Sequence, residues 1–128
     1  MPEQHENEGW QTALQRIEEA RRSNANELKL SGLNLTALPE SLGLLSQLQY
    51  LDLNNNQITA LSEWLGQLSQ LQSLDLDNNR LTTLPESLGR LSQLQYLYLS
   101  HNQFTALPEW LSWLSSPTRH ASSMPQNA

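Results

Sequence analysis

Leucines recur at a fixed interval along most of the chain. The stretches LQYLDLNNNQ, LQSLDLDNNR and LQYLYLSHNQ begin at Leu48, Leu71 and Leu94, so the same step separates each stretch from the one before. Each stretch contains two leucines that stand two positions apart, which places both on one side of a β-strand because side chains alternate between its faces. The pattern therefore predicts short strands that all present the same apolar face.

The second half of each repeat predicts a short helical turn. LPESLGLLSQ and LPESLGRLSQ begin with a proline and an acidic residue and then space leucines three positions apart. Proline suits the first position of a helix, and the three-residue spacing gives one apolar helical face. A single repeat cannot shield its leucines from water, so the repeats must stack and bury one continuous column. Each buried leucine contributes roughly 1.5–3 kcal/mol.

An asparagine recurs at the point where each strand is expected to end, at Asn56, Asn79 and Asn102. Asparagine side chains readily bond the backbone of turns. In register from repeat to repeat, the three are expected to form a structural ladder of hydrogen bonds between neighbouring turns. One repeat earlier the leucine pattern continues, but Leu33 stands in the asparagine position.

Residues 9–23, GWQTALQRIEEARRS, carry a different period. Trp10, Leu14 and Ile17 lie on one face of a helix, opposite a mixed charged face. A stack of repeats needs a terminal cap with a polar outer surface. We therefore predict a capping helix that covers the first repeat and stops at Asn24, with a membrane-binding or partner-binding helix as the alternative.

The motif L-x-x-L-x-L-x-x-N-x-L over residues 25–116 resembles the leucine-rich repeat. The resemblance implies an α/β solenoid, a short right-handed arc with a parallel sheet on its concave face and a capping helix at its N-terminus. The chain is then divided into a flexible N-terminus at 1–8, the cap at 9–24, about four repeats at 25–116 and a disordered tail at 117–128.

The 23-residue unit with L-P-E-x-L-G-x-L is similar to an intracellular class of these repeats. That class includes Ras-binding scaffold proteins, plant Ras-group repeat proteins and the repeat domains of bacterial Roco-type GTPases. The segment RIEEARRSNANELKLSGLNLTALPE, a helix running into a first repeat, is most similar to the start of the Roco-type proteins. The resemblance implies that the repeats bind or sense, while a separate GTPase domain acts.

Composition excludes several classes of function. The net charge of −6, with only seven lysines and arginines, disfavours nucleic acid. The absence of cysteine excludes disulfides and thiolate zinc sites and fits a reducing compartment. The sequence contains no readable secretory signal and no apolar run near the ~20 residues of a membrane span. We expect a cytoplasmic protein that does not bind membranes.

Catalytic chemistry is also disfavoured. The single lysine, Lys29, follows a leucine, so a phosphate-binding glycine-rich loop is excluded. The histidines, His5, His101 and His120, are scattered and lack partners at the spacing of metal ligands. We therefore expect no enzyme activity, no cofactor and no metal, and interpret the chain as a binding module.

The strand positions between the leucines are expected to face solvent on the concave side. Neighbouring strands lie about 4.7–4.9 Å apart, so Asp52, Asp75 and Asp77 should form an acidic patch with Tyr96 and Tyr98 beside it. Tyrosines and carboxylates suit an arginine or lysine of a protein partner. The alternatives are a face that is polar only for solubility and a divalent metal on the three aspartates. The candidate partner-binding residues are Tyr50, Asp52, Asn54, Asp75, Asp77, Tyr96, Tyr98 and His101.

The convex side carries tryptophans where other repeats have serine. Trp64 and Trp110 occupy the positions that hold Ser41 and Ser87 in the neighbouring units. They are predicted to fold back over the helical turns, with a second contact surface as the alternative.

The period breaks near the C-terminus. Position 117 should carry a leucine but holds Pro117, and the tail after it is too polar to form a core. The last repeat is then expected to leave an edge with unpaired backbone groups, which would be either the cut end of a longer ancestral solenoid or a self-association surface. Both imply association with rising concentration, most simply a two-fold dimer through residues 94–116. The side chains on this edge would be Leu97, Leu99, Phe104, Leu107, Leu111 and Leu114.

Taken together, the sequence predicts a non-enzymatic interaction module or scaffold in intracellular signalling. It would bind a protein partner, either basic or a small GTPase, through its concave face. The alternative is the sensory N-terminal repeat fragment of a larger Roco-type GTPase without its catalytic domain. A pathogen effector that acts in ubiquitin transfer is disfavoured by the 23-residue unit and the missing cysteine.

Overall fold

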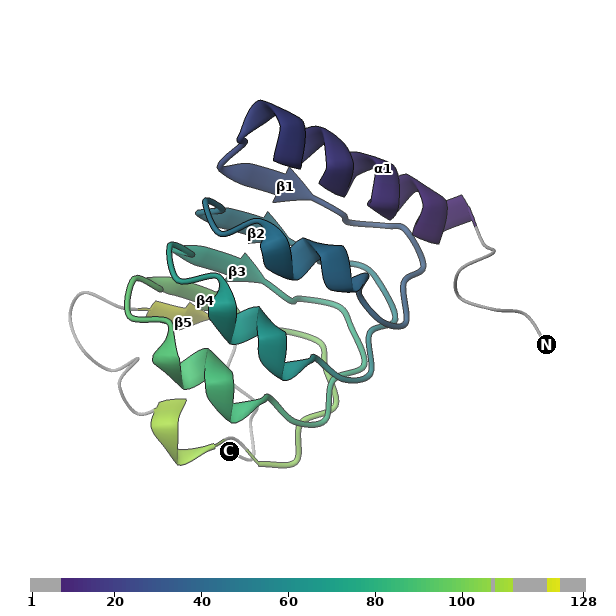
Figure 1. Cartoon of the computed structure of the whole chain (residues 1–128). Helices are drawn as coiled ribbons and strands as arrows, with labels where there is room; N and C mark the ends of the chain where they lie inside the picture. The colour runs from purple at the N-terminus through teal and green to yellow at the C-terminus, as the bar shows by residue number, and fades with distance from the viewer. Residues whose placement is uncertain (1–7, 107, 112–119, 123–128) are drawn as a thin grey trace.

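Strands and helical turns alternate along the chain and stack in sequence order. The computed structural model describes residues 8–106, 108–111 and 120–122. Figure 1 shows the strands side by side along one side of the stack, with the 3-10 turns on the opposite side and α1 across one end. The elements are α1 (Glu8–Ser23), β1 (Glu27–Lys29), η2 (Glu40–Leu44), β2 (Tyr50–Asp52), η3 (Glu63–Gln67), β3 (Ser73–Asp75), η4 (Glu86–Arg90), β4 (Tyr96–Tyr98) and β5 (His120–Ser122).

The strands form one parallel sheet in the order β1-β2-β3-β4-β5. Leu28 pairs with Leu51, Leu51 with Leu74, and Leu74 with Leu97, so each leucine lies beside its equivalent in the next repeat. The predicted repeat, its parallel sheet and its short helical turns are confirmed.

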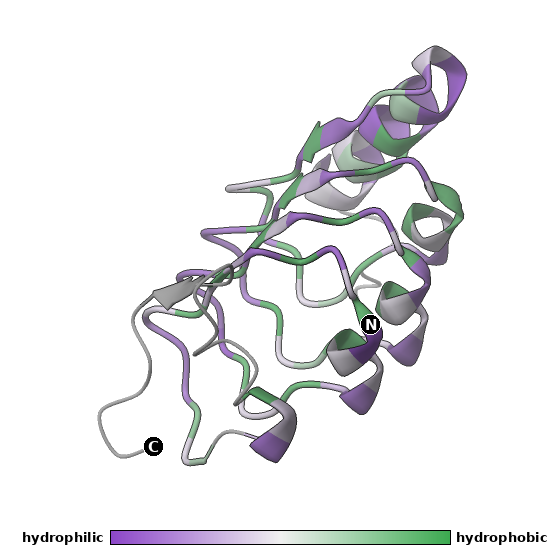
Figure 2. Ribbon diagram, turned by 90° about the vertical axis from the view of Figure 1, so that its left-hand side faces the viewer, coloured by the Kyte–Doolittle hydropathy of each residue, from purple (hydrophilic) through white to green (hydrophobic). Residues whose placement is uncertain are grey.

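Leucine side chains fill the interior of the stack. The two leucines of each strand region point inward and are almost completely buried in all four repeats, as are Leu42, Leu65 and Leu88 of the 3-10 turns. In Figure 2 apolar positions alternate with polar ones along the strands, as expected for a sheet with one face in the core. None of the helices in the described segments is long and apolar enough to cross a membrane.

Helix α1 closes the N-terminal end of the stack, as the sequence predicts. Trp10, Ala13, Ile17 and Ala20 are buried on one side of the helix, and Leu14 packs against the same core. The predicted stripe thus packs against the core of the stack, with buried Ala13 and Ala20 beside it.

The helix ends where the sequence places its stop. Asn24 adopts a left-handed conformation with φ of 54°, which asparagine tolerates better than most residues. The amide of Ala25 then donates to the carbonyl of Ala20 at 2.9 Å, and that of Asn24 to Arg21 at 3.3 Å. This pair of bonds is a Schellman motif, which satisfies the last carbonyls of the helix.

The C-terminal edge of the sheet was expected to be unpaired, but the structure shows a strand there. β5 pairs in parallel with β4 and aligns Ala121 with Leu97, so the prediction that the edge of β4 is unpaired is wrong. Leu97, Leu99, Phe104 and Leu111 are all buried. Leu107 and Leu114 lie outside the described residues.

The sequence pattern could not reveal β5, because backbone pairing needs only N–H and C=O groups. Ala121 stands at the register position of the leucines, and it comes one position later along the chain than the repeat spacing from Leu97 requires. The expectation of a disordered tail at 117–128 therefore does not hold for residues 120–122. The rest of that tail, and residues 1–7 of the predicted flexible N-terminus, lie outside the described residues.

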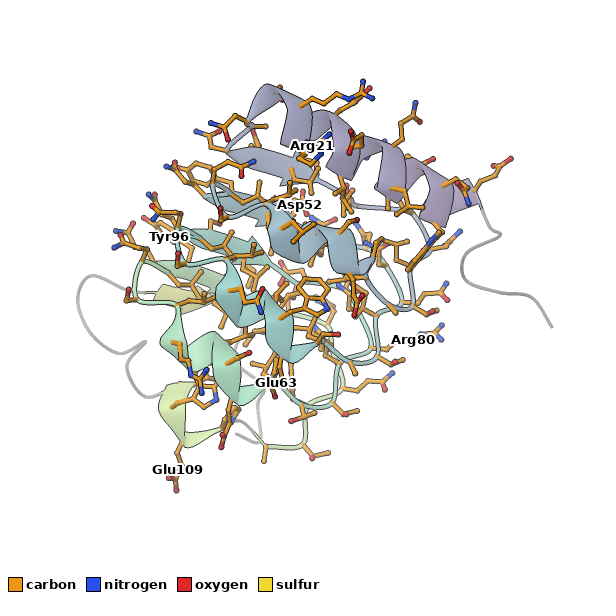
Figure 3. All side chains as sticks on the ribbon, viewed as in Figure 1. Arg21, Asp52, Glu63, Arg80, Tyr96 and Glu109 are labelled. Carbon is orange, nitrogen blue, oxygen red and sulfur yellow. The ribbon has the colours of Figure 1, made fainter. Side chains whose placement is uncertain are left out.

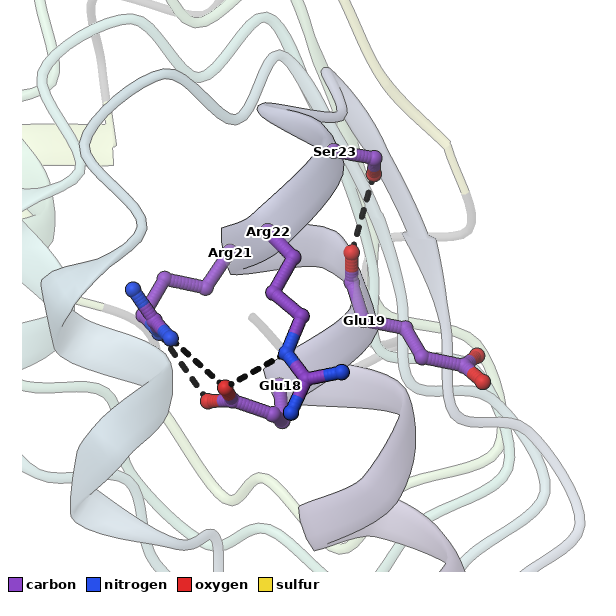
Figure 4. Close-up of polar contacts among 5 residues, drawn as sticks. All are labelled: Glu18, Glu19, Arg21, Arg22 and Ser23. Carbon is purple, nitrogen blue, oxygen red and sulfur yellow. Dashed lines mark hydrogen bonds and ion pairs between the residues drawn. The ribbon is translucent and has the colours of Figure 1, made fainter.

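The outer face of α1 carries a small ion-pair cluster (Figure 4). Glu18 accepts two hydrogen bonds from Arg21, at 2.6 and 2.9 Å, and one from Arg22 at 3.1 Å. These contacts, first among them the hydrogen bonds from Arg21, lower the pKa of Glu18 from 4.5 to about 2. All three side chains are exposed to solvent, so the cluster contributes little to stability.

The ion pairs of Glu18 should give a small, pH-dependent contribution to stability. A carboxyl group whose pKa is lowered by folding stabilises the fold above its unfolded pKa and stops doing so as pH falls through its folded pKa. The Glu18→Gln variant should therefore melt slightly below the parent protein at pH 7. The difference should vanish between pH 4.5 and about pH 2. A difference in melting temperature that persists at pH 2 would contradict the ion-pair origin.

Deleting residues 117–128 removes β5 and should expose the backbone edge of β4. We expect the truncated protein to self-associate with rising concentration, while the full chain does not, because an unpaired edge strand recruits other strands. Sedimentation velocity over about a hundredfold concentration range compares the two, with circular dichroism as the check that both are folded. Equal sedimentation of both proteins would show that β5 does not protect this edge.

Candidate protein-binding face

Asparagine side chains tie each turn after a strand to the turn before it. The Oδ1 of Asn56 accepts hydrogen bonds from the amides of Leu33 and Leu35, both at 3.0 Å. Its Nδ2 donates to the carbonyls of Leu30 and Leu53, also at 3.0 Å. One side chain therefore satisfies backbone groups of two consecutive repeats, including Leu33, whose own repeat lacks the asparagine.

The same arrangement recurs in the next two repeats. Asn79 accepts from the amide of Ile58 at 3.1 Å, and Asn102 accepts from that of Leu81 at 3.0 Å. Both donate to carbonyls of their own repeat and of the repeat before. Asn56 and Asn79 are buried, where an unsatisfied backbone group is costly. These bonds form a ladder that fixes the loops at the carboxyl ends of the strands.

A residue in a left-handed conformation recurs at one position of these loops, and the first loop has a second such residue at Asn34. Gly32, Asn55, Asn78 and His101 occupy equivalent positions, with φ between 58° and 69°. Glycine and asparagine are the residues that adopt this conformation most easily. His101, a predicted binding residue, therefore stands at a turn position. Its side chain is exposed at the rim of the concave face.

The register of the strands sets the order of side chains across the concave face. One row runs across the sheet from Tyr50 through Ser73 to Tyr96. The next row runs from Lys29 through Asp52 and Asp75 to Tyr98. Figure 3 labels Asp52 and Tyr96, which mark the two rows. The rings of Tyr96 and Tyr98 are stacked with centroids 6.4 Å apart and planes within 4°.

The three predicted aspartates are held in place by hydrogen bonds to the backbone. Asp52 accepts from the amide of Asn54, and Asp75 accepts from that of Asp77, both at 3.0 Å. Asp77 reaches the amide of Ser100 in the next repeat at 2.7 Å. These carboxylates therefore cap the strand ends as well as facing solvent, a common use of aspartate in turns.

Asn54 links two of the aspartates. Its backbone amide binds Asp52, and its Nδ2 donates to Oδ2 of Asp75 at 3.1 Å. All these side chains are partly exposed, so each carboxylate keeps acceptor capacity for a ligand. The acidic patch, defined as Asp52, Asp75 and Asp77, is thus rigid before any partner binds.

A shallow groove of about 210 Å³ runs along the first strands of the concave face. It brings together four of the predicted residues, Tyr50, Asp52, Asp75 and Tyr98. The other predicted residues, Asn54, Asp77, Tyr96 and His101, lie outside its lining. The lining consists of Glu27, Leu28, Lys29, Tyr50, Leu51, Asp52, Ser73, Asp75 and Tyr98.

Glu27 and Lys29 belong to this groove although the sequence analysis did not select them. Their side chains form an exposed ion pair with Nζ and Oε2 3.7 Å apart. Glu27 and Lys29 stand one repeat before Tyr50 and Asp52, so the repeat pattern alone could have identified them as neighbours of the predicted residues. The groove contains three carboxylates and one ammonium group, which leaves it acidic.

A metal on the acidic patch is not supported. In residues 8–106, 108–111 and 120–122, no three acidic or histidine side chains lie close enough together to hold a metal ion. The three aspartates instead accept hydrogen bonds from backbone amides in the loops after β2, β3 and β4. The metal alternative for Asp52, Asp75 and Asp77 therefore does not fit the observed geometry.

The convex tryptophans pack against glycines of the preceding turn. A Cβ atom on Gly43 would lie 2.9 Å from Trp64 Cε3, and one on Gly89 would lie 3.2 Å from Trp110. Both tryptophans are partly buried and pack against the core. The packing interpretation is therefore correct for these two side chains.

Comparison with known proteins identifies the repeat. A family model described as a leucine-rich repeat region matches residues 27–117. A search of curated proteins gives no match.

Three solved structures of similar fold are bacterial repeat proteins or effectors. A leucine-rich repeat protein of Leptospira interrogans shares 35% identity with a TM-score of 0.68, over 83% of this chain and 27% of that one. A Shigella effector domain shares 32% with a TM-score of 0.69, over 80% and 43%. The repeat domain of the type III effector XopL shares 27% with a TM-score of 0.73, over 80% and 35%. The chain thus spans less than half the length of each.

Replacing Asn79 by alanine should destabilise the protein by about 1–3 kcal/mol, because buried backbone groups of two repeats lose their partner. Chemical denaturation measures the change in the free energy of unfolding. Asn26→Ala is the matched control, since Asn26 is exposed and its side chain makes no hydrogen bond to the rest of the described chain. An unchanged denaturation midpoint for Asn79→Ala would contradict the structural role of the ladder.

Proposed function

Because the chain belongs to the leucine-rich repeat family, whose domains are generally protein-interaction modules, we propose that it is a non-enzymatic scaffold that binds a protein through its concave groove. The observation that carries this proposal is the groove between Asp52, Asp75 and Tyr98, where rigid carboxylates and an aromatic ring meet. Fixed side chains lose little conformational entropy on binding.

The groove suits a basic segment of a partner. A guanidinium group binds carboxylates through paired hydrogen bonds and stacks on aromatic rings. Asp75 and Tyr98 are neighbours in register and offer both contacts, while Tyr96 and Tyr50 extend the aromatic surface and remain exposed. We propose that an arginine of the partner lies between Asp75 and Tyr98, with the acidic patch attracting the flanking positive charge.

The narrower setting that we propose is intracellular signalling in the cytoplasm, with a small GTPase as one candidate partner. The support is the 23-residue L-P-E-x-L-G-x-L unit, which is similar to that of Ras-binding scaffolds and of Roco-type GTPases. A second candidate function is the sensory repeat unit of a larger signalling GTPase. It is supported by the segment RIEEARRSNANELKLSGLNLTALPE, a helix running into a first repeat, which is similar to the start of the Roco-type proteins.

These two candidates give different results with nucleotide-loaded GTPases as baits. A scaffold should bind a separate GTPase and discriminate between its GTP and GDP forms, whereas a sensory unit should bind other ligands and ignore both forms. An effector role is a third outcome, since two of the similar structures are effectors. The 23-residue repeat and the missing cysteine argue against an effector that acts in ubiquitin transfer. They do not argue against an effector that consists of a repeat domain alone.

Converting Asp52, Asp75 and Asp77 to asparagine should slow association with the partner. Asparagine keeps an oxygen acceptor for the amides of Asn54, Asp77 and Ser100, so the fold should persist while three negative charges disappear. The association rate should fall most at low salt and converge with that of the parent protein at high salt.

The partner is first identified by affinity purification and mass spectrometry, and its association rate is then measured for both proteins by stopped flow. The control variant converts Glu19, Glu86 and Glu109 to glutamine. These carboxylates are exposed and lie outside the groove, so the same change in net charge occurs elsewhere. Equal association rates at low salt for the groove variant and the control variant would refute the proposal.

A further inference from the structure

An apolar side chain stands exposed on the convex side of the stack. Leu44, the last residue of η2, is 72% exposed, more than any other large hydrophobic side chain of the described residues. Tyr50 and Tyr96 come next at 43% and 44%, but each carries a hydroxyl group that water can solvate.

The repeat itself shows that the fold does not need a leucine at this position. The equivalent residues of the next two turns are Gln67, which ends η3, and Arg90, which ends η4. Both are exposed and polar. Leu44 is therefore an apolar residue at a position where the next two turns carry polar residues and where core packing does not require a leucine.

Leu44 lies beside Trp64 in a groove of about 320 Å³. Trp64 packs against Gly43, so close that a Cβ on that glycine would lie 2.9 Å from Cε3 of its ring. The indole is thereby fixed in place and forms an apolar wall that needs no rearrangement to receive a ligand. The groove is lined by Glu40, Ser41, Gly43, Leu44, Trp64 and Gln67.

The charged side chain among those that line the groove is acidic. Glu40 lines it, Glu63 begins the adjacent turn, and neither η2 nor η3 carries a basic residue in its last turn. A ligand with an apolar group and a nearby cation would match both features.

We propose that this convex groove is a second docking site, for a short segment of another protein that presents a bulky apolar side chain next to a lysine or arginine. The apolar side chain packs against Leu44 and Trp64, and the cation lies against Glu40. The site is on the side of the stack opposite the sheet (Figure 1), so the two faces can be occupied together. The site extends the proposed scaffold function and does not depend on the concave groove.

The test uses a random displayed peptide library as the probe. Peptides are selected on the full chain and counter-selected on the Leu44→Gln variant, which gives this turn the residue of the next one. Selected peptides are then titrated in ¹⁵N NMR, with the Gly43 amide and the Trp64 indole N–H as reporters. Arg90→Gln is the matched control, a change at the equivalent position outside the groove.

We expect selected peptides to share an apolar residue beside a lysine or arginine and to shift both reporter signals. Their affinity should fall at least tenfold in Leu44→Gln and stay unchanged in Arg90→Gln. No enriched motif, a motif without cations, or shifts confined to the amides of Asp75 and Tyr98 would overturn the proposal. Self-association of the free chain that disappears in Leu44→Gln would overturn it in favour of a second copy.

Discussion

Lateral burial between repeats is the constraint on which this structure depends. A strand of three residues with one inward leucine cannot shield it alone, and a single repeat cannot form a core of its own. Leu28, Leu51, Leu74 and Leu97 are buried because each lies in register against the next. The constant spacing of these leucines keeps each of them in the same column.

A stack built in this way must end somewhere, and each of its ends is closed differently. At the N-terminus α1 lays a tryptophan, an isoleucine and alanines over the first repeat, and the Arg16 guanidinium donates to the outward carbonyl of Lys29 at 2.9 Å. At the other end β5 pairs with the backbone of β4 without supplying a leucine at the register position. One cap thus acts chiefly through apolar burial and the other through strand pairing.

The same constraint organises the concave face. Because the strands are in register, side chains one full repeat apart in sequence become neighbours, and the asparagine ladder holds the loops that follow them. Aspartates at the strand ends accept hydrogen bonds from loop amides and also present part of each carboxylate to solvent. The acidic patch is consequently preformed, which suits recognition of a partner by fixed charges.

The repeat, the cap and the neighbours on the sheet could be read from the sequence, because period and side-chain alternation determine them. The stop at Asn24 followed from known helix-ending chemistry. β5 could not be predicted, since HAS has no apolar pattern and backbone hydrogen bonding leaves no trace in side-chain type. The convex tryptophans were assigned correctly to packing, yet the groove beside Trp64 needed the structure, because a single exposed leucine in a leucine-rich chain carries no signal.

Hydrogen exchange of the strand amides tests most directly whether the stack is continuous and closed at both ends. The amides of Leu30, Leu53 and Leu76 donate to carbonyls of the next strand at 2.8–2.9 Å, and Tyr98, which precedes Leu99, pairs with Ser122 of β5. We expect the amide of Leu99 to be protected to an extent comparable with that of Leu76. Exchange of Leu99 at the rate of an unprotected loop amide, with Leu30 and Leu53 still protected, would contradict the account.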